Sequence, residues 1–248
     1  MRRLTDALRR AGTGALNLVY PRGITCHLCG IDLDAPGVLC ADCAGKLPPA
    51  GANGTRCSGC GRTYEGREPL CRKCGQYGPV SDGGFAAHDY TDAARSLLVA
   101  FKFEDRTSCR ELFAHGMIRA VRDGGIAGEI DCVVPVPMHW LRKLNRGYNQ
   151  SALLAAWVAE SLGKPVMRGV LARPVYTREL SRTQGGAIGR MESAYISYRP
   201  GRGSLAGKRV LLVDDILTTG STLRACVAIL RGMGAEKVYT VVAAAVPE

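Results

Sequence analysis

The sequence predicts an α/β fold, a parallel Rossmann-like sheet preceded by a small cysteine-rich domain. Three observations support this prediction. From Val80 onward, apolar runs of strand length alternate with helical patterns, as in chains that form parallel sheets. The run 210–213 is apolar at every position, which is typical of a strand buried on both faces. Four Cys-x-x-Cys pairs lie ahead of this pattern, between Cys26 and Cys74.

The expected elements of the α/β part follow one another with short connections. They are strand 86–90, helices 92–103 and 108–122, strand 130–136, helix 151–162, a strand beginning at Val166, strand 209–213, a helix ending at Gly234 and strand 238–246. Ligands of parallel sheets bind at the carboxyl ends of the strands. Two basic segments fall at such ends. Segment 135–150 joins a strand to a helix, and segment 173–190 is a candidate lid.

The segment 210–223, VLLVDDILTTGSTL, contains a predicted phosphate site. Asp214 and Asp215 stand where the central strand is expected to end, and a turn rich in glycine and hydroxyl groups follows them. Such a turn before a helix presents backbone N–H groups and side-chain donors to a phosphate. Two acids beside it can bind ribose hydroxyls or a magnesium-bound water. The segment therefore predicts a sugar-phosphate site, whose turn consists of Thr218, Thr219, Gly220, Ser221 and Thr222.

Positive charge is concentrated just before this motif. The chain has 248 residues, is 46% apolar and carries a formal net charge of +11. Between residues 139 and 209 there are 13 Lys or Arg against three Glu, a net charge of +10. A solvated basic face would explain such a block, but its position favours a site for a polyanion. Arg142, Lys143 and Arg146 are its candidates for phosphate binding.

The cysteine pairs predict two structural zinc sites. Each half of the pattern has ten residues between its two pairs, and the unit repeats after 31 residues. Each Cys-x-x-Cys pair can form a turn that directs both thiolates toward one ion, and two such turns supply the four thiolates of a closed tetrahedral site. Disulfides are the alternative, but we find no export signal that would place the chain in an oxidising compartment. The predicted ligands are Cys26, Cys29, Cys40 and Cys43 for one ion, and Cys57, Cys60, Cys71 and Cys74 for the other, although spacing alone allows a cross-braced arrangement.

These patterns divide the chain into three expected parts: an amphipathic helix at 1–22, a double zinc ribbon at 23–79 and an α/β domain at 80–248. No apolar stretch approaches the length that spans a membrane. Without an export signal or a membrane span, the expectation is a cytoplasmic protein.

The order of the motifs resembles that of the ComF (ComFC-type) competence proteins, which have a type I phosphoribosyltransferase fold behind a double zinc ribbon. The resemblance covers nearly the whole chain. It rests on the four cysteine pairs, Lys102-Phe103, Pro135-Val136-Pro137, the run RGYNQ at 146–150 and VDDILTTGST at 213–222.

The resemblance implies binding of phosphoribosyl pyrophosphate (PRPP) with Mg²⁺. In this family pattern Asp214 and Asp215 bind the ribose 2- and 3-hydroxyls, and residues 218–222 hold the 5-phosphate. Lys102, Arg142, Lys143 and Arg146 complete the implied PRPP-binding set. Purine-salvage relatives have a carboxylate at the position of Thr218, which argues against purine salvage here. The family also implies a role with single-stranded DNA and competence-machinery proteins in natural transformation.

Three functions remain open at this point. The first is a Mg²⁺-dependent phosphoribosyltransferase, and the second is a PRPP- or nucleotide-sensing adaptor without turnover. The third is a module that binds single-stranded DNA through the ribbon and the basic block. Aromatic residues make up 6% of the chain, few for a protein that stacks bases. No catalytic residue is assigned, and the acceptor substrate is not predicted.

Overall fold

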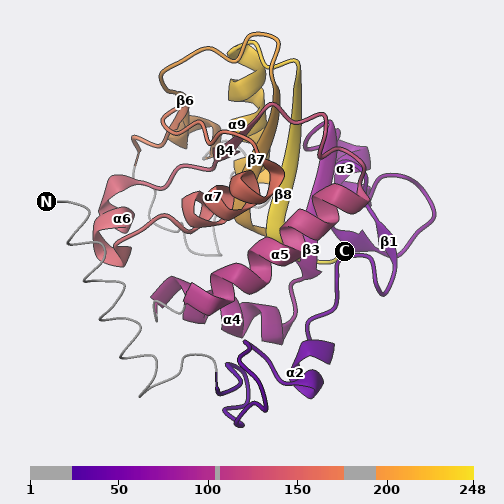
Figure 1. Ribbon diagram of the computed structural model, residues 1–248. Helices are drawn as coiled ribbons and strands as arrows, with labels where there is room; N and C mark the ends of the chain where they lie inside the picture. The colour runs from indigo at the N-terminus through magenta and orange to yellow at the C-terminus, as the bar shows by residue number, and fades with distance from the viewer. Residues whose placement is uncertain (1–23, 104–106, 176–193) are drawn as a thin grey trace, which may run out of the picture. The chain divides into compact units, whose positions relative to one another are not determined.

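The computed structural model describes residues 24–103, 107–175 and 194–248 (Figure 1). Contacts divide the chain into two compact units, Met1–Lys46 and Leu47–Glu248. The expected N-terminal helix at 1–22 and most of the candidate lid at 173–190 lie outside the described residues. None of the helices in the described part of the chain is long and apolar enough to cross a membrane.

The second unit contains the predicted parallel sheet. Its four strands are β3 (Gly83–Asp89), β8 (Lys237–Ala245), β7 (Arg209–Leu217) and β4 (Cys132–Pro135), hydrogen-bonded in that order. All three pairings are parallel. β8, which follows β7 in the chain, therefore lies between β7 and β3. The two edge strands of the sheet are β3 and β4. This arrangement confirms the predicted α/β class.

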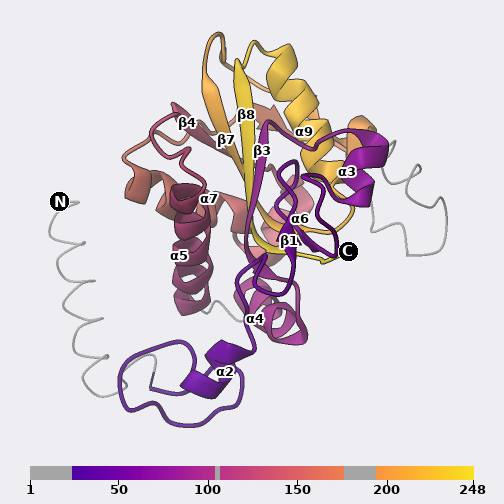
Figure 2. The same ribbon diagram turned by 90° about the vertical axis from the view of Figure 1, so that its right-hand side faces the viewer.

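Helices cover both faces of this sheet, as a parallel sheet requires. Figure 2 shows α5 (Thr107–Asp123) and α7 (Gln150–Leu162) on one side of the strands and α9 (Ser221–Gly232) on the other. The helix α4 (Asp92–Phe103) packs on α5. Between these layers the inner residues of β7 and β8 are almost all buried, which explains their continuous apolar sequence.

The central strand continues past the point expected from the sequence. β7 pairs with β8 as far as Leu217, whereas its pairing with β4 stops at Pro135 and Val213. Asp214 and Asp215 therefore lie within β7, at the part where its β4 side is uncovered, rather than after the strand. The continued pairing with β8 is the reason for the difference.

Two further connections differ from the expectation. The basic segment after β4 contains a short helix, α6 (Trp140–Arg146), whose N-terminal Leu141 N–H donates to the ring of His139 at 3.2 Å. Val166 forms only an isolated bridge with Val133. The next strand, β5 (Leu171–Ala172), pairs instead with β6 (Arg199–Pro200) in a separate two-stranded antiparallel sheet.

The second half of the cysteine-rich segment belongs to the same compact unit as the sheet. It consists of a hairpin, β1 (Thr55–Arg56) and β2 (Thr63–Tyr64), followed by α3 (Arg72–Tyr77). Its backbone packs directly on β3, because a Cβ atom on Gly84 would lie 2.3 Å from the Cα of Cys60. The first half, with α2 (Ala41–Gly45), belongs to the other unit.

Candidate functional site

A cavity of about 300 Å³ lies at the carboxyl ends of β4 and β7. Its wall brings together the two acids of β7, the turn that follows them and the start of α7. This is the place where a parallel sheet is expected to hold a ligand. The lining residues that carry polar groups are Arg142, Asn149, Gln150, Ser151, Arg173, Tyr198, Asp214, Asp215, Thr218 and Thr222.

The two acids differ in their surroundings. Asp214 is buried, and its Oδ1 accepts hydrogen bonds from the Ser151 hydroxyl and from the backbone N–H of Asp215, both at 2.9 Å. Asp215 is half-buried and lines the same cavity. Asp214 is thus oriented by the start of α7, and both acids line the cavity.

The turn after β7 has the shape that its sequence predicts. Gly220 precedes α9 with a φ of 82°, a left-handed conformation that glycine adopts without strain. The hydroxyls of Thr219 and Ser221 lie 2.9 Å apart. Thr218 and Thr222 line the cavity, at the N-terminus of a 12-residue helix. A helix start with several hydroxyl groups is suited to an anion.

The run RGYNQ at 146–150 positions α7 against this site. Gly147 ends α6 in a left-handed conformation, and the Tyr148 hydroxyl donates to the backbone oxygen of Phe101 in α4. Asn149 caps α7: its Oδ1 accepts from the Ser151 N–H at 3.1 Å, and its Nδ2 donates to the Val136 oxygen at 3.0 Å. Together these bonds fix the helix start beside the acids.

The predicted cations divide into three groups. Arg142 lines the cavity with the acids. Lys143 lines a neighbouring cavity of about 350 Å³, together with Arg168. The side chains of Arg146, at the end of α6, and Lys102, in α4, lie outside the described part of the structure.

Five polar residues of the cavity wall were not in the predicted set: Asn149, Gln150, Ser151, Arg173 and Tyr198. Arg173 stands at the start of the candidate lid and lies over the ring of Tyr198, 5.1 Å from its centroid. The amide of Gln150 is buried, and neither of its polar atoms has a hydrogen-bond partner among the described residues. The position of Gln150 directly after the cap of α7 was the available signal, whereas nothing local in the sequence marks Tyr198.

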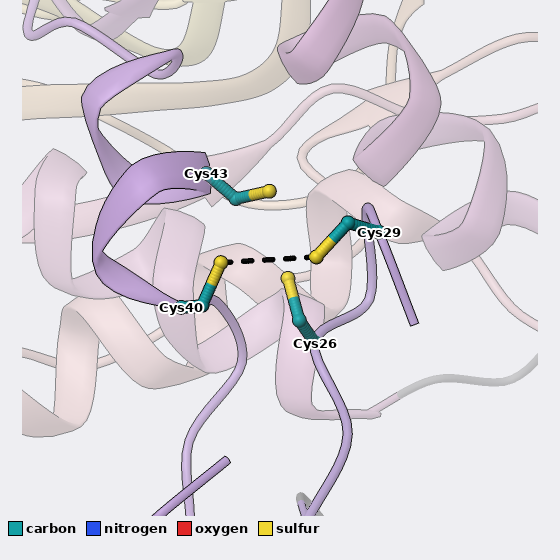
Figure 3. A group of neighbouring side chains, drawn as sticks. All are labelled: Cys26, Cys29, Cys40 and Cys43. Atoms are coloured by element: carbon teal, nitrogen blue, oxygen red, sulfur yellow. Dashed lines mark hydrogen bonds between the residues drawn. The ribbon is translucent and has the colours of Figure 1, made fainter. Parts of the chain in front are cut away.

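The eight paired cysteines form two clusters in sequential order. In each cluster the four sulfur atoms lie within 4.8 Å of one another. Figure 3 shows Cys26, Cys29, Cys40 and Cys43 with their sulfur atoms turned toward one another. The second cluster, Cys57, Cys60, Cys71 and Cys74, is buried throughout, with each residue at most 1% exposed. Neither cluster is cross-braced.

Comparison with known proteins agrees with this arrangement. The phosphoribosyl transferase domain family matches residues 150–248, and the double zinc ribbon domain family matches residues 15–75. Competence protein F of Haemophilus influenzae is 29% identical over 221 residues, which cover 80% of this chain and 93% of that protein. The chain is therefore similar to competence protein F over most of its length, with a double zinc ribbon domain ahead of a phosphoribosyl transferase domain.

Other relatives support the same assignment of the two domains. The DNA utilization protein YhgH of Escherichia coli K12 is 26% identical over 230 residues, 83% of this chain and 96% of that protein. Adenine phosphoribosyltransferase of Nocardia farcinica is 42% identical over 99 residues, which cover 38% of this chain and 46% of that enzyme. The similarity to this enzyme thus covers only part of the chain.

Both cysteine clusters fit zinc. A tetrahedral site with Zn–S bonds of about 2.3 Å places its sulfur atoms about 3.8 Å apart. The sulfur atoms of Cys29 and Cys40 lie 3.7 Å apart, and those of Cys60 and Cys71 lie 3.8 Å apart. Hydrogen bonding with Cys60 lowers the pKa of the Cys57 thiol, and the same contact raises that of Cys60. Four thiols this close cannot all ionise easily without a cation, because their negative charges would repel one another.

Proposed function

We propose that this protein binds PRPP, or a related 5-phosphorylated ribose, with Mg²⁺ in the cavity between β4, β7 and α7. The observation that carries the proposal is the meeting of two acids, a hydroxyl-rich helix start and two arginines around one cavity of about 300 Å³. The acids Asp214 and Asp215 suit the ribose hydroxyls, and the turn 218–222 suits the 5-phosphate. Arg142 and Arg173 suit the pyrophosphate group.

The donor atoms also suit Mg²⁺. Magnesium prefers oxygen ligands and usually keeps several waters while it contacts one or two carboxylates and the phosphates of a substrate. Asp214 and Asp215 supply such carboxylates on the cavity wall. When bound, Mg²⁺ would neutralise part of the charge on the pyrophosphate group. Ser151 holds Asp214 in place for either role, through its hydrogen bond of 2.9 Å.

A phosphoribosyl transfer is the reaction that this site would support. Pyrophosphate would leave ribose C1 through an oxocarbenium-like state, and Arg142 and Arg173 would stabilise the negative charge that develops on the leaving group. Thr218 offers no carboxylate as a base for a purine ring, so the proposed acceptor is not a salvaged purine, despite the similarity to an adenine phosphoribosyltransferase. A sensor of PRPP without turnover would use the same residues.

We propose further that the site serves in DNA uptake. The names of the relatives, competence protein F and DNA utilization protein, support a role with DNA. The basic block at residues 139–209 supplies the positive charge that a nucleic-acid backbone attracts. Binding of single-stranded DNA without catalysis is therefore the second candidate function.

Isothermal titration calorimetry with PRPP and ribose 5-phosphate, each with and without Mg²⁺, tests the first proposal. The double variant Asp214→Asn, Asp215→Asn keeps the shape of both side chains but removes their charge. We expect Mg²⁺-dependent PRPP binding to be lost and the folded structure to be retained, as circular dichroism can check. Asp123→Asn, in an exposed residue at the end of α5, is the matched control. Unchanged affinity in the double variant would reject the site.

A further inference from the structure

Two arginines are buried between the second cysteine cluster and the turn after β7. Arg62 is 1% exposed and Arg224 is 9% exposed. Arg62 follows the third cysteine pair, Cys57 and Cys60, by two residues, whereas Arg224 lies in the first turn of α9. The two guanidinium groups thus come from opposite sides of the contact between the ribbon and the phosphoribosyl transferase domain.

Arg62 connects a cysteine ligand to the turn directly. Its Nε donates to the Sγ of Cys60 at 3.4 Å, and one terminal nitrogen donates to the backbone oxygen of Thr218 at 2.7 Å. The other terminal nitrogen donates to the Val246 oxygen, 3.3 Å away, just after β8. Thr218 lines the ligand cavity, so one planar side chain holds both the thiolate and the cavity wall.

Arg224 makes the second connection. One terminal nitrogen donates to the Sγ of Cys74 at 3.9 Å, and the other donates to the backbone oxygens of Tyr77 and Pro79 at 3.0 and 3.3 Å. Its own backbone N–H donates to the oxygen of Gly220 at 2.9 Å. Gly220 also packs against Val80, because a Cβ atom there would lie 3.3 Å from the Val80 side chain.

The positive charges of Arg62 and Arg224 suit a second cysteine cluster that is loaded with zinc. Among the residues described, no carboxylate forms an ion pair with either arginine. A buried cation without an anionic partner is costly. Zn²⁺ with four thiolates carries a charge of about −2, which the two guanidinium groups would balance. Loss of zinc would leave both arginines without this balance.

We infer that the second zinc centre positions the phosphate turn, and that Arg62 and Arg224 transmit its occupancy to the ligand cavity. Zinc bound by Cys57, Cys60, Cys71 and Cys74 fixes both guanidinium groups, and these fix Thr218 and the start of α9. The contacts that carry this coupling all come from the second cluster, whereas the first cluster belongs to the other compact unit. The inference rests on the proposed binding of a ribose 5-phosphate group at the turn.

Thermodynamic linkage makes the inference measurable in both directions. If zinc at the second cluster raises the affinity for ribose 5-phosphate, ribose 5-phosphate must raise the affinity of that cluster for zinc by the same factor. We expect a factor of about ten, within the usual range of coupling between sites. The measurement is zinc retained by the full chain at equilibrium with a competing chelator, with and without saturating ribose 5-phosphate.

Variants assign the effect to one cluster. Cys26→Ser disables the first cluster and leaves the second, whose zinc affinity should rise with ribose 5-phosphate. Arg62→Lys keeps the positive charge, but one ammonium group cannot reach Cys60, Thr218 and Val246 together. This variant should keep its zinc and lose most of the coupling. Arg67→Lys, in an exposed arginine of the same ribbon, is the matched control.

A spectroscopic measurement separates positioning from mere structural support. In the Cys26→Ser variant loaded with Co²⁺, absorption from the cobalt–thiolate bonds should shift when ribose 5-phosphate binds, because Arg62 and Arg224 donate to two of the sulfur atoms. The wild-type protein provides the zinc measurement even if a cysteine variant fails to fold.

The outcomes are distinguishable. Ribose 5-phosphate that binds the wild-type protein, with no change in zinc affinity and no cobalt shift, would overturn the coupling and leave the proposed function intact. Absence of any binding to the zinc-loaded wild-type protein would overturn the proposed function and the coupling with it. Equal coupling in Arg62→Lys and wild type would overturn the role of Arg62.

Discussion

At the scale of single residues, Gln150 destabilises the folded protein and also lines the proposed ligand cavity. Its side chain is 1% exposed, and its amide has no hydrogen-bond partner among the described residues. A buried polar group without a partner destabilises a protein by about 1–3 kcal/mol. A residue that raises the free energy of the folded protein in this way, on the wall of a cavity, is suited to bind a ligand.

Replacement of Gln150 by Leu should therefore separate stability from binding. We expect the melting temperature to stay the same or rise, since the unpaired amide is removed. The affinity for ribose 5-phosphate should fall by about 10–100-fold, the effect of losing a hydrogen bond to a charged group. Thermal unfolding and calorimetry on the same preparation measure both. Gln76→Leu, in an exposed glutamine of α3, is the control, and equal affinity in the two variants would argue against a ligand contact.

Arg62 has a place in the structure that reasoning from sequence at this scale does not predict. Most arginines are exposed, and the sequence around Arg62 does not mark it as an exception. The structure instead buries it against Cys60 and Thr218. Its burial depends on Thr218, 156 positions further along the chain, so no local pattern could have revealed it.

At the scale of elements, periodicity predicted the type of element better than its ends. The helix expected at 92–103 is found at Asp92–Phe103, and the last helix and strand also lie where expected. The end of β7 was predicted too early, because pairing with β8 continues through polar residues that read as a strand end. The sequence did not predict α6, because this helix has only 7 residues and its N-cap is His139 rather than Ser or Asp.

The beginnings of β4 and β7 are held together by Asp131. The backbone N–H of Arg209 donates to its Oδ2 at 2.7 Å, and the Arg209 side chain lies 3.4 Å from the same oxygen. These two bonds, the backbone bond first, lower the pKa of the Asp131 carboxyl. A carboxyl with a lowered pKa stabilises the folded protein above its unfolded value of about 3.9, and this stabilisation is lost as the pH falls through the folded value.

The variant Asp131→Asn should thus melt roughly a few degrees lower than wild type at pH 7, and the difference should shrink below about pH 4. Thermal unfolding from pH 7 to pH 3 measures this. The comparison must be made between variants at each pH, because acid also protonates the zinc thiolates. Asp123→Asn, which removes an exposed carboxylate without an ion pair among the described residues, should show no such trend. A difference that stays constant down to pH 3 would contradict the role of Asp131.

At the scale of the whole molecule, the two cysteine clusters belong to different compact units although the sequence repeats them as equals. The spacing of each pair is the same, but Lys46 and Leu47 mark the boundary between the units. The first cluster has an exposed cysteine, Cys29, whereas the second is buried throughout. Repetition in the sequence therefore predicted the two cysteine clusters but not the difference in their burial.

Elemental analysis should find about two zinc ions per chain, as two closed four-thiolate sites require. Cys26→Ser should lower this to about one and leave the affinity for PRPP unchanged, because the remaining cluster is the one bonded to the turn through Arg62 and Arg224. Cys109→Ser, in a buried cysteine outside both clusters, should keep both ions. A zinc content near zero together with disulfides would reject the zinc assignment.

The basic block at residues 139–209 raises the question of which surface of the protein would bind DNA. The block carries a net charge of +10 between residues 139 and 209, and Lys143 in α6 is exposed. The second ribbon contributes fewer available charges than its sequence suggests: Arg62 is buried, and Arg72 lies 3.1 Å from Glu248. We therefore expect the DNA surface to coincide with the PRPP surface rather than with the ribbon.

Binding of single-stranded DNA at several salt concentrations tests this expectation. Replacing Arg142, Lys143 and Arg146 by Gln should reduce the salt dependence of the binding constant by about two units of log–log slope, because each phosphate contact on a single strand contributes about 0.7. The same change should weaken PRPP binding, and PRPP should compete with DNA for the wild-type protein. The matched variant replaces Arg67, Arg72 and Lys73 of the ribbon by Gln and should affect both ligands far less. DNA binding that survives the first change and disappears with the second would place the DNA surface on the zinc ribbon, since the charge lost is the same in both variants.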